Sequence, residues 1–161
     1  MVKITGIEAE MKRLRAGIKE FEKEAVAVMR DATMVVLAEL FANTPVWSGE
    51  TVRNYAVGVG SMPGGGTKGF IGGAPEPTSN KSMGSENNRA ANEAAAVSDA
   101  STAVAAMTKL QSVYITNLVD GAKWDLIDSG NAPEPGRARN PGGVSKLAEI
   151  NAKAALSQHF R

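Results

Sequence analysis

The amino-acid sequence predicts an α+β domain with a long N-terminal helix, a small and mainly antiparallel sheet, a long Gly/Pro/Ser-rich loop and a C-terminal helix. Three observations predict it. An apolar stripe with helical spacing covers residues 4–35, two short segments alternate in the manner of strands, and a Gly- and Pro-rich region at residues 60–85 separates them. The 161 residues fit a single domain, residues 1–161, and the 43% hydrophobic content beside 22% charged residues predicts a buried core.

The first helix is the clearest pattern in the chain. Its apolar residues recur at alternating steps of three and four: Ile4, Ile7, Met11, Leu14, Ile18, Phe21, Ala25, Val28, Ala32 and Val35. Thr5 and Glu8 have the spacing of a capping box, and Pro45 disfavours helix at the residue before it, which predicts a helix from about residue 5 to Asn43. The spacing is also heptad-like, so the stripe can pack on its own domain or between subunits.

The segment after this helix predicts a strand and then a long loop. A turn signal at Ser48-Gly49 precedes the alternating run "NYAVGVG", which predicts a strand over residues 52–59. Residues 60–85 are mostly Gly, Pro, Ser, Thr and Asn, and Phe70-Ile71 is their one apolar pair. So long a loop is uncommon inside a compact domain, so we expect a binding loop or a segment that a partner orders.

The second half of the chain predicts two more helices and one strand. Residues 86–110 are rich in Ala, which favours a helix, although Ser98, Ser101 and Thr102 weaken its middle and can split it. Residues 113–116 alternate as a strand does, and a short apolar cluster around Trp124 follows them. Apolar residues at helical spacing over 144–160 predict the C-terminal helix.

Composition argues against several functional classes. Eighteen Lys and Arg against seventeen Asp and Glu leave a net charge of +1, which gives no electrostatic case for nucleic acid as the main partner. Without cysteine and with one histidine, His159, neither thiol chemistry nor a zinc site is expected. No apolar run approaches the ~20 residues that span a bilayer, and the first residues do not resemble a signal peptide, so we expect a cytoplasmic protein with no membrane partner.

Two stretches suggest chemistry, and neither has a second supporting feature. The run "GSMPGGGTKGF" contains the Gly and Lys of a phosphate loop, but Gly66-Thr67-Lys68 does not open a helix in the required order. Four acids lie close together in the sequence: Asp120, Asp125, Asp128 and Glu134. They could hold a divalent cation or act as an acid/base pair, yet solvated turn residues have the same pattern. We therefore expect no enzyme and no cofactor, and keep metal-dependent catalysis by these acids as an alternative.

Three separated stretches resemble the tail-completion, or head–tail joining (neck), proteins of long-tailed bacteriophages. "TPVWSGETVRNYAV" looks like the family's Thr-Pro-Val followed by a Gly turn and a strand. "VYITNLVDGAKWDLIDSGNAPEPG" is similar to its Tyr-Ile-x-Asn strand end, short apolar segment and Gly, and "RARNPGGV" is similar to the Pro/Gly loop before its last helix. The three stretches follow the family's order.

The resemblance implies a structural virion protein rather than an enzyme. It implies a homo-oligomeric ring, for which we expect a hexamer, at the head-proximal end of the tail. The ring completes the tail, joins it to the head and lets genomic DNA pass through its lumen without sequence specificity. The implied partners are the tail tube or tail terminator protein and the head–tail connector proteins. Assembly then takes place in the cytoplasm of the host bacterium, and the product is part of the virion.

Five residues in the predicted loops are expected at interfaces of that ring: Trp47, Phe70, Ile71, Arg137 and Arg139. Phe70 and Ile71 lie in a loop too polar to pack by itself, and the two arginines lie in a Gly/Pro loop. For Trp47 a core position is an equal alternative. Two other functions remain open, a tail terminator of the adjacent ring and a coiled-coil interaction protein built on the stripe at residues 4–35.

Overall fold

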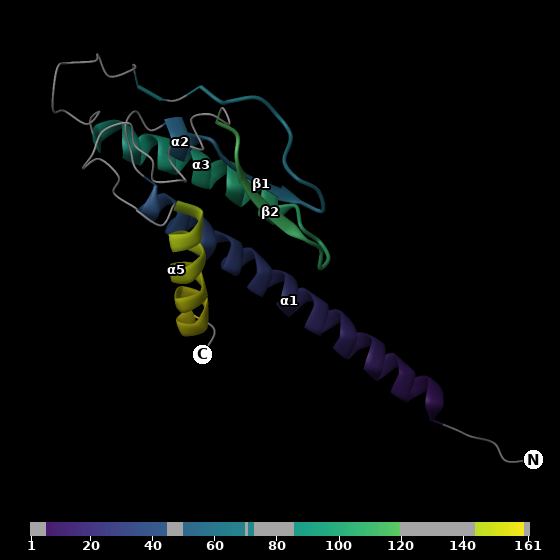
Figure 1. The fold of residues 1–161 in the computed structure, drawn as a ribbon. Coiled ribbons are helices and arrows are strands. Elements are labelled where there is room, and N and C mark those ends of the chain that lie inside the picture. The colour runs from purple at the N-terminus through teal and green to yellow at the C-terminus, as the bar shows by residue number, and fades with distance from the viewer. Residues whose placement is uncertain (1–5, 45–49, 70, 73–85, 120–143, 160–161) are drawn as a thin grey trace, which may run out of the picture.

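The computed structural model of the chain describes residues 6–44, 50–69, 71–72, 86–119 and 144–159. Its elements are α1 (Ile7–Asn43), α2 (Glu50–Arg53), β1 (Tyr55–Val59), α3 (Glu86–Ala105), β2 (Val113–Asn117) and α5 (Val144–His159). The predicted α+β class is confirmed, with its long N-terminal helix, its small antiparallel sheet and its C-terminal helix. Figure 1 shows α2, α3, both strands and α5 gathered around the C-terminal part of α1, while the N-terminal part of α1 projects away.

Helix α1 has a free part and a packed part. Its buried residues, Val26, Thr33, Leu37 and Phe41, all lie in the second half of the helix. Every described residue from 6 to 24 is exposed. The helix begins at Ile7, after Gly6 in a left-handed conformation (φ 110°), and ends at Asn43 as predicted. We call residues 7–24 the arm and the rest of the described structure the body.

The chain enters the sheet later than predicted. Residues 50–53 form the helical turn α2, so the expectation of a strand from residue 52 was wrong by three residues. Local hydrogen bonds explain the turn, because the backbone N–H of Asn54 donates to the carbonyl oxygen of Glu50 at 3.1 Å and its side-chain amide donates to the same oxygen at 2.8 Å. The turn places Val52 in the core with no exposed surface.

The sheet consists of β1 and β2, paired antiparallel with Tyr55 opposite Asn117 and Val59 opposite Val113. One further backbone hydrogen bond extends the ladder at each end, from Gly60 to Ser112 and from Leu118 to Asn54. Residue 58 must be glycine here, because a Cβ atom would come within 2.3 Å of the carbonyl oxygen of Ser61 as the chain folds back. The predicted strand at residues 113–116 is confirmed and extends by one residue.

Helix α3 is continuous where the sequence suggested a break, and it ends at Ala105 rather than near residue 110. The hydroxyl of Thr102 donates to the carbonyl oxygen of Ser98 one turn earlier, at 3.0 Å. This bond satisfies the hydroxyl inside the helix, so it does not compete with the helical backbone.

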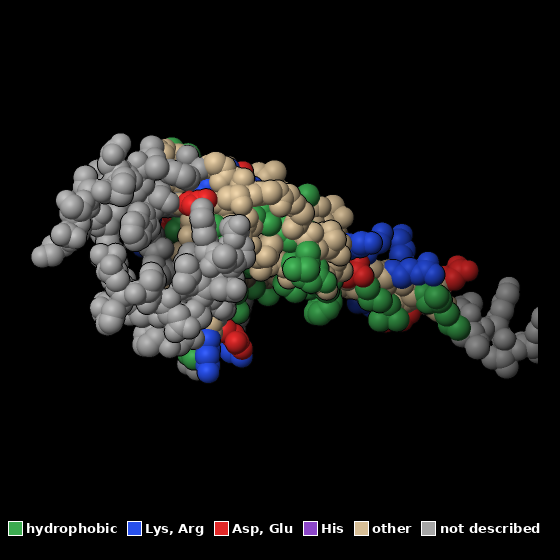
Figure 2. Space-filling model, turned by 45° about the horizontal axis from the view of Figure 1, so that its top comes forward, with side chains coloured by type: hydrophobic (Ala, Val, Ile, Leu, Met, Phe, Trp, Pro, Cys, Tyr) green, Lys and Arg blue, Asp and Glu red, His purple; other side chains and the backbone are tan. Residues whose placement is uncertain are grey.

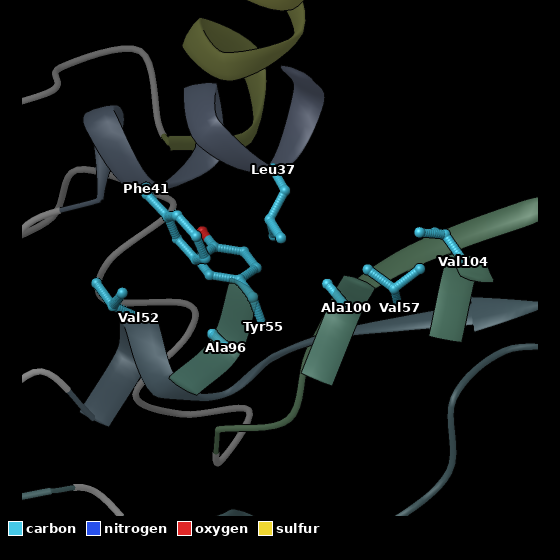
Figure 3. Packing of buried hydrophobic residues seen from close by; sticks show 8 residues of the cluster. All are labelled: Leu37, Phe41, Val52, Tyr55, Val57, Ala96, Ala100 and Val104. Carbon is cyan, nitrogen blue, oxygen red and sulfur yellow. The ribbon is translucent and has the colours of Figure 1, made fainter. Parts of the chain in front are cut away.

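One hydrophobic cluster joins α1, α2, α3 and β1 (Figure 3). Its buried members are Leu37, Phe41, Val52, Tyr55, Val57, Ala96, Ala100 and Val104. The rings of Phe41 and Tyr55 meet edge to face, with centroids 5.7 Å apart, a geometry that aromatic pairs favour. The cluster faces α3 through alanines, so the helix backbone can approach the sheet closely. Helix α5 packs on α1 and buries Ala148 and Ala152.

Candidate assembly surfaces

Of the five residues predicted at interfaces, one falls within the described structure. Ile71 has 47% of its surface exposed, while Trp47, Phe70, Arg137 and Arg139 lie outside the described residues. The acids predicted as an alternative metal or catalytic cluster, Asp120 to Glu134, also lie outside them. Two surfaces of the described structure remain as candidates for assembly, the loop that carries Ile71 and the apolar stripe of α1.

The loop residues 60–69 and 71–72, which we call the strap, are fastened to the body by two buried asparagines. The side-chain oxygen of Asn54 accepts from the backbone N–H of Lys68 at 2.6 Å, and its amide donates to the Lys68 carbonyl oxygen at 3.1 Å. Asn92 bonds the N–H and the carbonyl of Ile71 in the same way, at 2.8 and 2.9 Å. Both asparagines are completely buried. Sequence reasoning missed them because no local pattern distinguishes an asparagine that binds a distant backbone.

An ion cluster holds the same segment from the outside. Asp99 of α3 accepts hydrogen bonds from Lys68 at 2.8 Å and from Arg53 at 2.7 Å. The bond from Lys68, followed by that from Arg53, lowers the pKa of Asp99 below its ordinary value of 3.8. The ammonium group of Lys68 is therefore directed at a carboxylate of its own chain, which adds a structural reason against the phosphate-loop interpretation of "GGGTKGF".

The strap is therefore ordered by its own domain over the described residues, and it still presents apolar side chains outward. Met62 is 67% exposed, and Ile71 is exposed beside the Asn92 anchor. The expectation that a partner orders this loop stays a prediction for residues 73–85, which lie outside the described structure.

The larger candidate surface is the apolar stripe of α1. Six large apolar side chains on it are between 47% and 66% exposed: Ile7, Met11, Leu14, Ile18, Phe21 and Val28. We call these six residues the seam. In Figure 2, hydrophobic side chains line one edge of the projecting arm, and charged side chains cover the opposite edge. One such residue on a surface is ordinary, but a continuous row of six is typical of an interaction surface.

The residues of α1 that are buried against the body differ from those of the seam. At 100° per residue, buried Val26 and Thr33 lie about 160° and 140° around the helix from Val28. Helix α5 packs on the C-terminal part of α1, where Asn151 donates to Asn43 at 3.4 Å, so the body contacts α1 from more than one side there. The seam remains exposed from Ile7 to Val28.

The charges along the arm balance. Its acidic residues are Glu8, Glu10, Glu20, Glu22 and Glu24, and its basic residues are Lys12, Arg13, Arg15, Lys19 and Lys23. Two intrahelical pairs are formed, Arg13 with Glu10 at 3.7 Å and Lys23 with Glu20 at 3.4 Å, all with well exposed side chains. A neutral arm provides little attraction for nucleic acid or an anionic membrane, so apolar contact dominates any binding to the seam.

The described ranges contain no group of three metal-ligating side chains that could hold a metal ion. Within the same ranges, no helix combines the length and the apolar character required to cross a bilayer.

Comparison of the chain with models of protein families, with curated proteins and with solved structures found no significant match. Function is therefore inferred from the sequence and from the geometry of the strap and the seam.

Proposed function

We propose that the chain is a structural subunit of a ring at the head-proximal end of a long-tailed phage tail, where it completes the tail and joins it to the head. The ordered resemblance of three stretches to tail-completion proteins supports this role. In the structure the long helix α1 precedes the first of these stretches, and the second stretch begins with strand β2.

The exposed seam is the structural observation that supports a role in an assembly. Most helical stability in proteins comes from packing an amphipathic face. The arm contributes no buried side chain to its own body. An exposed apolar row such as the seam marks a surface that a partner covers, as in a subunit of an assembly.

A ring closes by rotation through heterologous contacts, so each subunit also requires a patch that lies outside the seam. The strap can supply that patch. Asn54 anchors its backbone at Lys68 and Asn92 anchors it at Ile71, so Ile71 is exposed at an anchored position. Met62 is exposed in the same strap. A preordered loop loses less conformational freedom on binding than a mobile one.

The proposal is tested by the mass of the purified full-length protein, alone and mixed with isolated tails, using light scattering and negative-stain imaging. We expect a closed ring, or a smaller species that forms a cap on one end of the tail. A protein that neither assembles nor binds tails contradicts the proposal. To separate the role from that of a tail terminator, the protein is added to polymerising tail tube, since a terminator limits tube length and a completion ring binds finished tails.

A coiled-coil interaction protein without a tail role is the second candidate, and the heptad spacing of the seam favours it. It predicts self-association that is indifferent to tails. Binding of the chain to one end of the tail decides against it.

A further inference from the structure

We infer that the seam is covered by the seam of a second copy of this chain, the two arms pairing in parallel as a two-stranded coiled coil from Ile7 to Val28. The inference goes beyond the tail role and does not depend on it, because it concerns one contact between two copies. It follows from the spacing of the seam, from the charges beside it and from the exposure of its residues.

The spacing of the seam is that of a coiled coil. Its residues fall at the a and d positions of successive heptads, Met11 and Ile18 at a and the other four at d. A shallow hollow on the arm is lined by Leu14, Gly17, Ile18 and Phe21, together with Glu10 and Arg13. Leu14, Gly17, Ile18 and Phe21 are the four positions that form the hole for an a-position side chain of a parallel partner.

The charges beside the seam support a parallel pair. In a parallel coiled coil the g position of one helix faces the following e position of the other. This places Glu10 of each copy against Arg15 of the other, one attractive contact on each side of the seam. The next pair is Gly17 with Glu22, which carries no repulsion.

The antiparallel alternative is opposed by the same charges. In an antiparallel pair, e faces e and g faces g. The overlap that sets Met11 against Phe21 places Glu8 against Glu22, Glu10 against Glu24 and Arg15 against its own copy. The overlap that sets Met11 against Val28 brings Arg15 to Glu22, but it places Glu10 against Asp31 and Ile7 against the partly buried Ala32. Like charges in direct opposition destabilise a pair and set partner orientation.

The seam is exposed along its whole length. Val28, its last residue, is 47% exposed although it lies beside buried Val26. Helix α5 packs on α1 beyond the seam, where Asn151 donates to Asn43, so the pairing is confined to the part of α1 from Ile7 to Val28.

The first test measures self-association of the full-length protein by sedimentation at several concentrations. We expect wild-type protein to form dimers or larger species, and Ile18→Glu to raise the dissociation constant at least tenfold because it sets two carboxylates in the apolar layer. Ala16→Glu is the matched control, since it adds the same charge to the outer face of the arm, and we expect no change. Ile18 contacts no part of the body, so an unchanged near-UV spectrum shows that the variant is folded.

The second test measures whether the two arms run parallel or antiparallel. Because the chain has no cysteine, an introduced thiol can form a disulfide only with the same thiol of another copy. Ile7→Cys places its thiols side by side in a parallel pair, within disulfide distance, and far apart in an antiparallel pair. We expect mild oxidation to cross-link Ile7→Cys and not the outer-face control Ala9→Cys. In the charge series, Glu10→Arg and Arg15→Glu should each weaken the pair, and the double variant should restore it.

Several outcomes overturn the inference. The pairing is refuted if the wild-type protein stays monomeric over the accessible concentration range. It is also refuted if Ile18→Glu does not weaken the assembly. If Ala9→Cys forms the disulfide and Ile7→Cys does not, the arms do not pair in parallel through the seam. A monomer that binds vesicles of neutral lipid assigns the seam to a lipid surface, and one that associates only with tails assigns it to a tail protein. Loss of tail binding with pairing intact instead affects the proposed function alone.

Discussion

Asn54 and Asn92 each offer one donor and one acceptor to a backbone residue of the strap, as a neighbouring strand would. A buried backbone N–H or carbonyl group without a partner costs about 1–3 kcal/mol, so a Gly-rich loop can lie on a domain only if its polar groups are satisfied there. The two asparagines satisfy Lys68 and Ile71 where no strand is available. This explains how a segment with hardly any large side chains keeps a defined path.

Replacing Asn54 by Ala tests this role. We expect the free energy of unfolding to fall by about 2–3 kcal/mol in urea titrations, because the Lys68 N–H and the Lys68 carbonyl lose their buried partner. Amide exchange at Lys68 should accelerate more than exchange in α3. Asn54→Asp is the control, since it retains an acceptor for the N–H and protects that amide better than Ala does. Unchanged exchange at Lys68 in Asn54→Ala would show that the strap is held by other contacts.

Asp99 makes the attachment of the strap dependent on pH. Its pKa is lowered in the folded state, so the ion cluster stabilises the fold above the unfolded-state value near 3.8 and loses this effect as the pH falls through the lower folded value. The side chain is 45% exposed, so solvent screening limits the contribution to about 1 kcal/mol or less. We expect Asp99→Asn to destabilise the protein at pH 7 and to have no effect below both pKa values. A constant difference from pH 7 to pH 2 would contradict the assignment.

At the scale of elements, α1 and α3 satisfy each other's C-terminal carbonyl groups. Neither helix has a basic residue in its last turn. Arg30 of α1 donates to the carbonyl oxygens of Ala105 and Met107 at the end of α3, and Arg89 of α3 donates to that of Phe41 near the end of α1. Each guanidinium supplies a positive charge at the negative end of the partner's helix dipole. The two helices are thereby held antiparallel at a defined offset.

Removing one of these arginine caps should lower the free energy of unfolding. We expect Arg30→Met to lower the free energy of unfolding by about 1–3 kcal/mol, measured by chemical denaturation, because it leaves two carbonyl oxygens without their charged donor. The loss is partly offset, since Nε of Arg30 is buried and has no partner among the described residues. Arg13→Met in the exposed arm is the matched control and should change stability by no more than about 0.5 kcal/mol. Equal effects of the two substitutions would rule out the cap.

At the scale of the molecule, the protein divides into a body that stabilises itself and an arm that does not contribute to it. The cluster from Leu37 to Val104 closes without any residue of the arm. Stability and self-association are therefore encoded in different parts of one helix. A substitution in the seam can change assembly while the fold is unaffected.

Deleting residues 1–22 separates the two properties. In dilute solution we expect the thermal midpoint of the shortened chain to equal that of the full chain, because residues 6–22, the described part of the deleted segment, are all exposed. At high concentration the full chain should unfold at a higher temperature than the shortened one, since association stabilises the folded state by mass action. Calorimetry over a range of concentrations measures both. A lower midpoint for the shortened chain at every dilution would assign the arm to the body.

Local patterns in the sequence determined the elements. The stripe predicted α1, Pro45 marked its end, and alternation located both strands of an antiparallel pair, because helical and strand periodicities are properties of neighbouring residues. The predicted boundaries were wrong where a side chain forms a hydrogen bond with the backbone one turn away. Asn54 closes a helical turn at Glu50 in place of strand, and Thr102 bonds back to Ser98 and keeps α3 whole. The interface roles of Trp47, Phe70, Arg137 and Arg139 stay predictions, since these residues lie outside the described structure.

The sequence by itself determined that one face of the first helix is apolar, and it left open whether that face packs on the body or on another subunit. Only the tertiary structure showed that the body buries Val26, Thr33 and Leu37 and leaves the seam exposed. It also decided that Asn54 and Asn92 hold the strap and that Arg30 and Arg89 cap distant helices. The physical reason is that these contacts join residues far apart in the chain, which no local periodicity encodes.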